Sequence, residues 1–272
     1  MYYSLISSMK KAVSAMDADA TAFITATGIT DTTQKNAINT LVLNLKSYGI
    51  WSKAKAIYPF VGGTATTHKY NLKNPLDTDA AFRLLFNGGW THSSGGVLPN
   101  GTTAWANTFL KPSLELSQDS ASLGSYLRGP ATPYSPSGIH IGCANSDYSK
   151  GLYTTWTFDP GSGNEFSRNN NNLAGSTLTD KISRGFIQNY RTSSTNMKVL
   201  KDNSTSISNT NATTGLAAHN IYIGAMNLGG TTSFYNNIEL AFSSICTGLT
   251  DTEANNFYTA VQAFQTTLAR QL

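Results

Sequence analysis

The feature that most constrains the fold of this chain is a period-two alternation of side chains that runs from Ala56 to Ile245. Alternate residues of a strand point to opposite faces of a sheet, so each segment can bury one face. The pattern occurs in seven segments: "SLGSYLR" (122–128), "GIHIGC" (138–143), "LYTTWTF" (152–158), "GFIQNYR" (185–191), "MKVLKDN" (197–203), "NIYIGAM" (220–226) and "IELAFSSI" (238–245). Turn-forming Asn and Gly clusters separate them, without helical crossovers, which predicts an antiparallel β-sandwich or jelly roll.

Helices are expected on both sides of this β-rich region. The near-identical stretches "TGITDT" (27–32) and "TGLTDT" (247–252) each precede residues with helical apolar spacing. Thr250 is a candidate N-cap with Glu253 completing a capping box, and Thr30 is the matching candidate cap in the first copy. No similarity follows beyond the helices, so two convergent helix starts are favoured over an internal repeat. We expect a helical segment over residues 1–55 and a sandwich over 56–272 that ends in a helix.

Composition excludes several classes of protein. Charged residues make up 12% of the chain and the net charge of +4 is scattered, whereas nucleic-acid binding needs a basic stripe. No apolar run approaches the roughly 18 residues of a membrane span, and the first residues lack the core of a secretion signal. We therefore expect a soluble protein made in a cytoplasm, with a surface of Ser, Thr, Asn and Gly and no nucleic-acid partner or membrane insertion.

The sequence shows no recognisable motif for catalysis or for metal binding. Glycosidases need two positioned carboxylates, and no close pair occurs among the four glutamates, Glu115, Glu165, Glu239 and Glu253. Asp147 and Asp159 flank a strand and could still meet in space, which leaves an enzyme open as a lesser alternative. The histidines lack metal-ligand spacing and no nucleophile elbow exists. The sequence predicts no catalytic residue, no metal, no cofactor and no enzyme, with a disulfide between Cys143 and Cys246 possible but unsupported.

Aromatic residues in segments expected to be loops are the candidate binding residues. Aromatic rings stack on the C–H faces of sugars, while amides and hydroxyls bond sugar hydroxyl groups. Trp90 lies in "NGGWTHSSGG", Trp105 in "NGTTAWANT" and Tyr134 in "TPYSPSG". We take these three as candidate carbohydrate-binding residues. The alternative is that they pack inside the sandwich, as is expected for Trp156 in its strand.

Two long segments carry a family resemblance. The first is "AIYPFVGGTATTHKYNLKNPLDTDAAFRLLFNGGWTHSSGGVLPNGTTAWANTFLKP" (56–112) and the second is "IELAFSSICTGLTDTEANNFYTAVQAFQTTLARQL" (238–272). Both resemble a recurring module of bacteriophage virion proteins, of the structural or tail-fibre-like kind. The last strand, "GLTDTE" and the following helix are also similar to the close of concanavalin A-like (laminin G-like) sandwich domains. The resemblance covers the chain from about residue 17 onward, without the calcium-binding Asp/Asn set of plant lectins.

The resemblance implies a phage virion protein with a concanavalin A-like sandwich, assembled in the bacterial host cytoplasm. It would lie on the particle exterior as a fibre, spike or decoration and bind a host-surface glycan or another virion protein. Homo-oligomers are usual for such proteins, with a trimer favoured, and the helical segment would pack on the sandwich or dock to the particle. One alternative is a purely structural capsid or tail component without glycan binding. A glycan depolymerase is the other.

Overall fold

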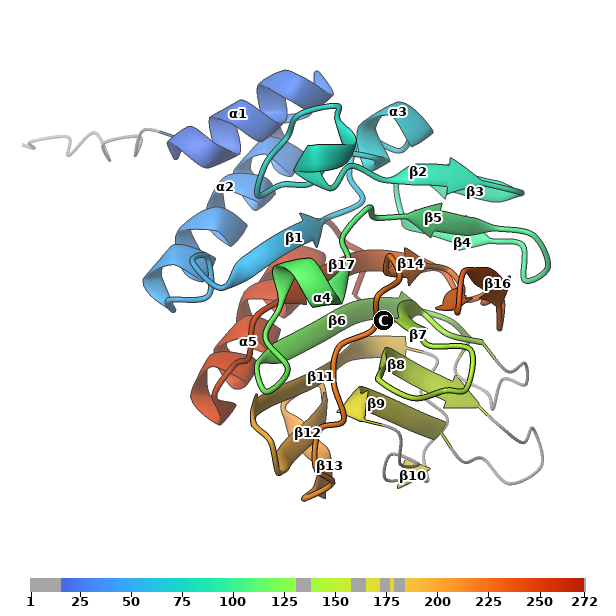
Figure 1. Cartoon of the computed structure of the whole chain (residues 1–272). Coiled ribbons are helices and arrows are strands. Elements are labelled where there is room, and N and C mark those ends of the chain that lie inside the picture. The colour runs from blue at the N-terminus through green and yellow to red at the C-terminus, as the bar shows by residue number, and fades with distance from the viewer. Residues whose placement is uncertain (1–15, 131–137, 158–164, 172–176, 179–183, 272) are drawn as a thin grey trace, which may run out of the picture.

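The computed structural model describes residues 16–130, 138–157, 165–171, 177–178 and 184–271 (Figure 1). Two sheets of mostly antiparallel strands pack face to face, and helices precede and follow them in the chain. The predicted class, a mainly β sandwich with helices near both ends, is therefore confirmed. β1 (Ala54–Tyr58) crosses the predicted boundary between residues 55 and 56, and the division into two units stays a prediction.

The first sheet has the order β13-β12-β11-β6-β17-β4-β3, with β1 also pairing with β17. Its strands are β3 (Trp90–Ser93), β4 (Gly96–Pro99), β6 (Ala121–Arg128), β11 (Arg184–Ser193), β12 (Asn196–Lys201), β13 (Ser204–Asn209) and β17 (Leu240–Cys246). The central pairs join strands far apart in sequence: β6 lies between β11 and β17. This long-range pairing is the expected consequence of a sandwich rather than a chain of hairpins.

The second sheet has the order β10-β9-β8-β7-β14-β5-β2, and β15 joins it by a parallel pair with β7. Its strands are β2 (Leu85–Asn87), β5 (Trp105–Asn107), β7 (Ile141–Ala144), β8 (Gly151–Thr157), β9 (Glu165–Asn171), β10 (Thr177–Leu178), β14 (Tyr222–Ile223), β15 (Met226–Leu228) and β16 (Thr231–Ser233). Several of these strands have only two or three residues, which is too short for an alternation pattern to show in the sequence.

The helices are α1 (Ala18–Thr27), α2 (Thr32–Ser47), α3 (Ala65–His68), α4 (Pro112–Glu115) and α5 (Asp251–Thr267), with one 3₁₀ turn, η1 (Asp79–Ala81). At the start of α5 both halves of the predicted capping box form between Thr250 and Glu253. At the start of α2 the cap is Asp31, whose carboxylate accepts from the Gln34 N–H at 2.7 Å. The predicted cap, Thr30, was wrong by one residue because aspartate competes equally well for that position.

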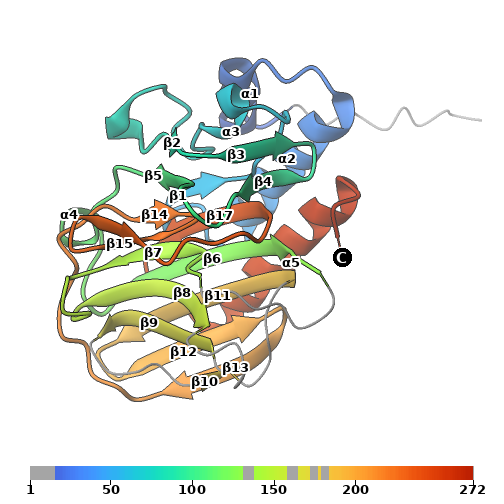
Figure 2. The same cartoon turned by 90° about the vertical axis from the view of Figure 1, so that its right-hand side faces the viewer.

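Two large hydrophobic cores hold the layers together. One fills the space between the two sheets and includes Leu123, Ile141, Ile187 and Ile245. The other lies between the outer face of the first sheet and helices α1, α2 and α5, where Phe186 and Phe242 meet Phe257 and Phe264. Figures 1 and 2 show these three helices on the same side of the sandwich. The first sheet is therefore buried on both faces.

The end of α5 is fixed by a buried arginine. The Arg270 guanidinium is 3% exposed and donates to the carbonyls of Phe60 (2.8 Å), Pro59 (3.1 Å) and Ala241 (3.1 Å). Its Nε donates to the side-chain oxygen of Gln265 at 2.9 Å. One side chain thereby joins the last turn of the chain to β17 and to the segment after β1. Moving this side chain would leave buried donors and carbonyl groups without hydrogen-bond partners. Because that costs free energy, these bonds stabilise the position of Arg270.

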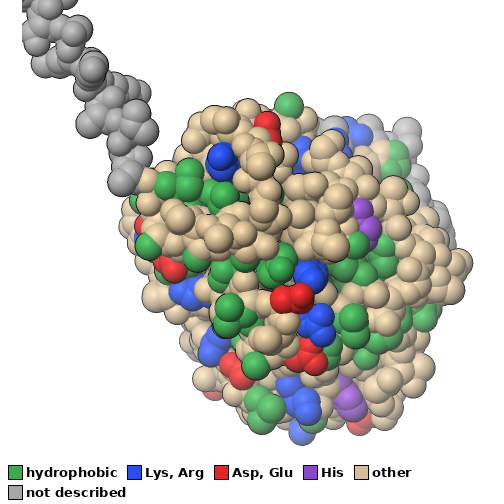
Figure 3. Space-filling view, turned by 90° about the horizontal axis from the view of Figure 1, so that it is seen from above, with side chains coloured by type: hydrophobic (Ala, Val, Ile, Leu, Met, Phe, Trp, Pro, Cys, Tyr) green, Lys and Arg blue, Asp and Glu red, His purple; other side chains and the backbone are tan. Residues whose placement is uncertain are grey.

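Other expectations concern cysteines, charge and membranes. Cys143 and Cys246 are both buried and free, so the possible disulfide between them does not form. Figure 3 shows Lys, Arg, Asp and Glu side chains scattered over a mainly uncharged surface on the face seen from above. Among the described residues, none of the helices combines the length and apolar character required for a membrane span.

Candidate functional site

The candidate site lies on the outer face of the second sheet, where β2, β5 and β14 pair. In the register, Leu85 and Tyr222 flank Asn107, while Asn87 lies opposite Trp105. The alternate residues of these strands, such as Ala106, point into the core between the sheets. The first set therefore shares the outward face. We call Leu85, Asn87, Trp105, Asn107 and Tyr222 the aromatic–amide patch.

The centre of the patch is a stacked pair of rings. The Trp105 and Tyr222 centroids lie 4.3 Å apart with an interplanar angle of 29°. Trp105 is partly exposed, whereas Tyr222 is only 9% exposed. Burial raises the pKa of the Tyr222 hydroxyl. The pair thus has one buried ring and one partly exposed ring that is held by the stack, an arrangement that costs a ligand little ordering of side chains.

Amide groups border the rings. The Asn107 side-chain oxygen accepts from the Phe109 N–H at 2.9 Å, and the Asn87 side-chain NH₂ donates to the Leu85 carbonyl at 3.0 Å. Each bond orients one amide and uses one end of it. Within the described part of the chain, the Asn107 NH₂ and the Asn87 oxygen have no further partner. One donor and one acceptor are therefore available beside an aromatic platform.

Trp90 packs behind the patch, on the core side of the second sheet. It was expected in a loop but lies in β3, partly buried against the core between the sheets. Its ring packs edge-on against Phe86 at 5.3 Å, and its indole N–H donates to the carbonyls of Asn87 (3.0 Å) and Trp105 (3.4 Å). Gly224 accommodates the ring, since a Cβ there would lie 2.5 Å from it. Trp90 thus fixes the backbone on which two residues of the patch stand.

The structure describes some of the other predicted site residues and leaves others outside the described residues. Trp105 was also expected in a loop and instead lies in β5, because a three-residue strand between Gly- and Asn-rich turns carries no alternation signal. Tyr134 lies outside the described residues, as does the side chain of Trp156. The structure therefore brings Trp90 and Trp105 together from strands of opposite sheets, through the hydrogen bond from the Trp90 indole to the Trp105 carbonyl, and the assignment of Tyr134 stays a prediction.

Tyr222, Asn87 and Asn107 were missed by sequence reasoning. The signal for Tyr222 was present, since Ile221 and Ile223 are both fully buried and the residue between them must face outward. The amides had no signal of their own because asparagine is abundant throughout the chain. Only the register of three short strands places them beside the rings.

Near the patch, two histidines form a hydrogen-bonded pair. The Nδ1 atoms of His68 and His92 lie 3.0 Å apart, and the Gly63 N–H donates to His68 Nε2 at 3.2 Å. His68 is 1% exposed, and burial lowers its pKa to about 3. Burial also lowers the pKa of His92. No group of three potential metal ligands occurs among the described residues, so this pair does not extend into a metal centre there.

The described carboxylates are used in structural contacts. Glu253 completes the α5 cap and pairs with Lys53 at 2.6 Å. Glu239 was expected inside a strand but precedes β17, where it pairs with Arg128 at 2.5 Å. Glu115 pairs with Lys55 at 3.5 Å. The Asp147 carboxylate accepts from the Ser149 hydroxyl, while Asp159 and the side chain of Glu165 lie outside the described residues.

Comparison with known proteins identifies similar folds but no family. Neither a protein-family model nor a curated protein matches the chain. Among solved structures, a mutant of Trypanosoma rangeli sialidase that displays trans-sialidase activity matches with a TM-score of 0.53 and 9% identity, over 84% of this chain and 39% of the sialidase chain. A structure of botulinum neurotoxin type C, whose cell entry depends on interaction with two ganglioside molecules, matches with a TM-score of 0.50 and 10% identity, over 79% of this chain and 53% of the toxin chain.

The match to a sialidase corrects one expectation. The sequence predicted that the chain is not an enzyme, and that prediction is contradicted because an enzyme has the same fold over most of this chain. Scarce and separated glutamates were the basis of the prediction. This chain spans about two fifths of the matched sialidase and about half of the matched toxin. At these identities the likeness concerns the fold alone.

Proposed function

We propose that this chain binds carbohydrate through the aromatic–amide patch. The observation that carries the proposal is the Trp105–Tyr222 stack on an outward sheet face, with free hydrogen-bonding ends of Asn87 and Asn107 beside it. An exposed ring can cover the C–H face of a sugar, while the amides bond its hydroxyl groups. The fold shared with a sialidase and with a toxin that interacts with gangliosides supports this class of ligand.

The biological setting that we propose is the exterior of a bacteriophage particle, where the chain is part of a fibre, spike or decoration. The ligand is then a glycan of the host surface. The resemblance of residues 56–112 and 238–272 to a module of phage virion proteins supports this setting, and so does the weakly charged, Ser-, Thr-, Asn- and Gly-rich surface. Immunogold labelling of purified particles with an antibody against this chain tests it, and particles without label contradict it.

The binding test compares the wild-type protein with Trp105→Ala on a glycan array and on host cells. We expect the substitution to weaken binding about tenfold or more, since central aromatic contacts dominate such sites. Trp105→Phe keeps a smaller ring and should give an intermediate affinity. Leu114→Ala is the matched control, because Leu114 is 75% exposed on α4 and lies outside the patch. Binding that is unchanged by Trp105→Ala, or no glycan binding by the wild-type protein, refutes the proposal.

A further inference from the structure

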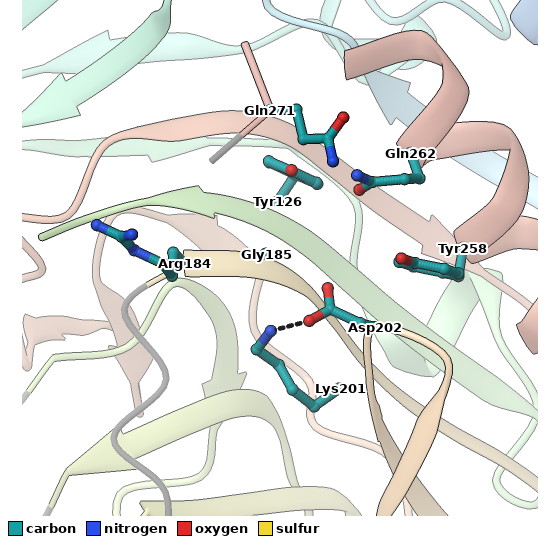
Figure 4. A pocket seen from close by; sticks show the side chains of 8 residues that line it. All are labelled: Tyr126, Arg184, Gly185, Lys201, Asp202, Tyr258, Gln262 and Gln271. Atoms are coloured by element: carbon teal, nitrogen blue, oxygen red, sulfur yellow. Dashed lines mark hydrogen bonds and ion pairs between the residues drawn. The ribbon is translucent and has the colours of Figure 1, made fainter. Parts of the chain in front are cut away.

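A hollow lies on the first sheet, beside the C-terminal helix. It has a volume of about 240 Å³ and is bounded by β6, β11, the β12–β13 turn and α5. Figure 4 shows Asp202, Tyr258, Gln262 and Gln271 around one space, with Lys201 at its edge. Tyr258 and Gln262 are four residues apart on α5, so both project from the same side of the helix. The hollow is thus lined by polar side chains from β6, β11, the β12–β13 turn, and α5 with the residues after it.

The polar groups of this hollow are not all used within the protein. Over the described residues, the Tyr258 hydroxyl and the Gln262 amide have no hydrogen-bond partner. The Gln271 oxygen accepts from the Thr266 hydroxyl at 2.6 Å, which orients that amide and leaves its NH₂ available. Because Arg270 is anchored beneath, the backbone that carries Gln271 is held in place. Three polar groups with unused hydrogen-bonding capacity, one of them oriented, are therefore available to an external ligand.

Two of the charged side chains in the hollow, Lys201 and Asp202, form an ion pair. The Asp202 carboxylate pairs with Lys201 and also accepts from the Phe186 N–H at 2.9 Å. Arg184 lines the hollow as well, but Figure 4 shows its guanidinium directed away from the shared space. Arg184 donates to the Gly129 carbonyl at 3.2 Å and has no ion pair within the described residues, so it is the one lining charge without a counter-charge, and it does not face the shared space. A neutral ligand rich in hydroxyl groups would find a carboxylate, two amides and a phenol, all of which can bond hydroxyl groups.

We propose that this hollow is a second saccharide site, which accepts one neutral hexose unit. Its volume of about 240 Å³ is below the roughly 300–1,000 Å³ of sites that take drug-sized ligands, which favours one ring over a chain. The site lies on the helix-covered sheet, whereas the aromatic–amide patch lies on the other sheet. The inference goes beyond the proposed function and does not depend on it. Two sites on one chain would raise avidity for a glycan-coated surface without any new contact.

The test is a titration of the full chain with neutral methyl hexosides (glucoside, galactoside, mannoside), followed by two-dimensional ¹⁵N NMR. We expect saturable shifts of the Gln262 and Gln271 side-chain amides and of the Gly185 backbone amide for at least one hexoside. Glucuronic acid serves as the charged comparator and should bind more weakly. Absence of saturable shifts at these amides with every hexoside overturns the proposal.

Two conservative variants locate the site. Tyr258→Phe keeps the ring and removes only the hydroxyl, and Gln262→Met keeps the length and removes the amide. Each should weaken the titrated affinity about fivefold, the equivalent of one net hydrogen bond. Tyr70→Phe is the matched control, because Tyr70 is partly buried against the helix-covered core and does not line the hollow. Wild-type affinity in both Tyr258→Phe and Gln262→Met overturns the proposal.

The Trp105→Ala protein separates this inference from the proposed function. Shifts at Gln262 should persist in that variant, since the two surfaces share no residue. If hexosides shift only amides near Trp105, the second site is refuted and the aromatic–amide patch stands. If they shift only amides around Gln262, and Trp105→Ala leaves all glycan binding unchanged, the patch is refuted and the second site stands.

Discussion

The outer faces of the two sheets differ in how far their aromatic residues are buried. On the first sheet, Phe186 and Phe242 are fully buried beneath Phe257 of α5. On the second sheet, Trp105 stacks on Tyr222 and stays partly exposed. The same residue type therefore stabilises the fold on one face and is presented to solvent on the other. Aromatic content alone says nothing about function until the covering layer is known.

The largest expected effect is on the covered face. Phe257→Ala should lower the free energy of unfolding by about 3–5 kcal/mol, because it leaves a cavity between α5 and the sheet. Urea unfolding measures this loss. Thr259→Ala, at an exposed position of the same helix, is the control and should change the unfolding free energy by less than about 0.5 kcal/mol. Equal losses in the two variants would mean that α5 does not cover a true core.

The second largest effect on stability is expected at Arg270, which holds the end of α5 in place. Arg270→Lys keeps a charge but cannot supply the guanidinium's planar set of donors, so buried carbonyl groups lose partners. We expect a loss of about 2–3 kcal/mol in unfolding free energy. Arg83→Lys, whose side chain is 27% exposed and pairs with Asp79, should cost far less. A similar cost for both arginines would refute the role of the anchor.

Acid should weaken the fold through its buried histidines. Burial lowers the pKa of His68 and of His140 to about 3, whereas an unfolded histidine titrates near about 6.5. Below about pH 6.5 the unfolded chain binds protons that the folded chain does not bind. Stability is then lost as the pH falls toward about 3, by about 1.4 kcal/mol per pH unit for each histidine.

Urea unfolding at several pH values between about 7 and about 5 measures this slope, above the range in which carboxylates titrate. His68→Gln can keep an acceptor toward Gly63 and should make the slope shallower. A stability that does not change over this range, or a slope unaltered by the substitution, contradicts the expected titration.

The smallest effect on stability is expected on the open face. Trp105→Ala removes one stacked ring at a partly exposed site and should cost about 1 kcal/mol or less. The same unfolding measurement checks this, beside the binding test above. A loss as large as that of Phe257→Ala would show that the patch is part of the core rather than a surface for a ligand.

The sequence predicted the sandwich and its flanking helices because long strands carry repeated signals. β6, β11 and β17 each alternate over seven or more residues, and the α5 cap is fully local. The candidate site could be predicted only in part. Trp90 and Trp105 were chosen for their type, but their strands have three or four residues, which is less than any periodicity test requires.

The remaining features depend on long-range pairing. Asn87 meets Trp105 because β2 pairs with β5, and Tyr222 arrives from a strand more than a hundred residues later in the chain. The hollow at Gln262 similarly needs the β12–β13 turn beside α5. Local sequence contains no information on such register. The expectation about enzymes rested on local carboxylate spacing, whereas the finding that contradicts it is a likeness of the whole fold to a sialidase.

The histidine pair has a consequence for where its protons lie. The Gly63 amide donates to His68 Nε2, so a neutral His68 carries its proton on Nδ1. That proton points at His92 Nδ1, which must accept it and therefore carries its own proton on Nε2. One backbone amide thus selects the tautomer of two imidazole rings in turn. Substituting either ring should release the other from its tautomer, a change that ¹⁵N chemical shifts of the ring nitrogens record directly.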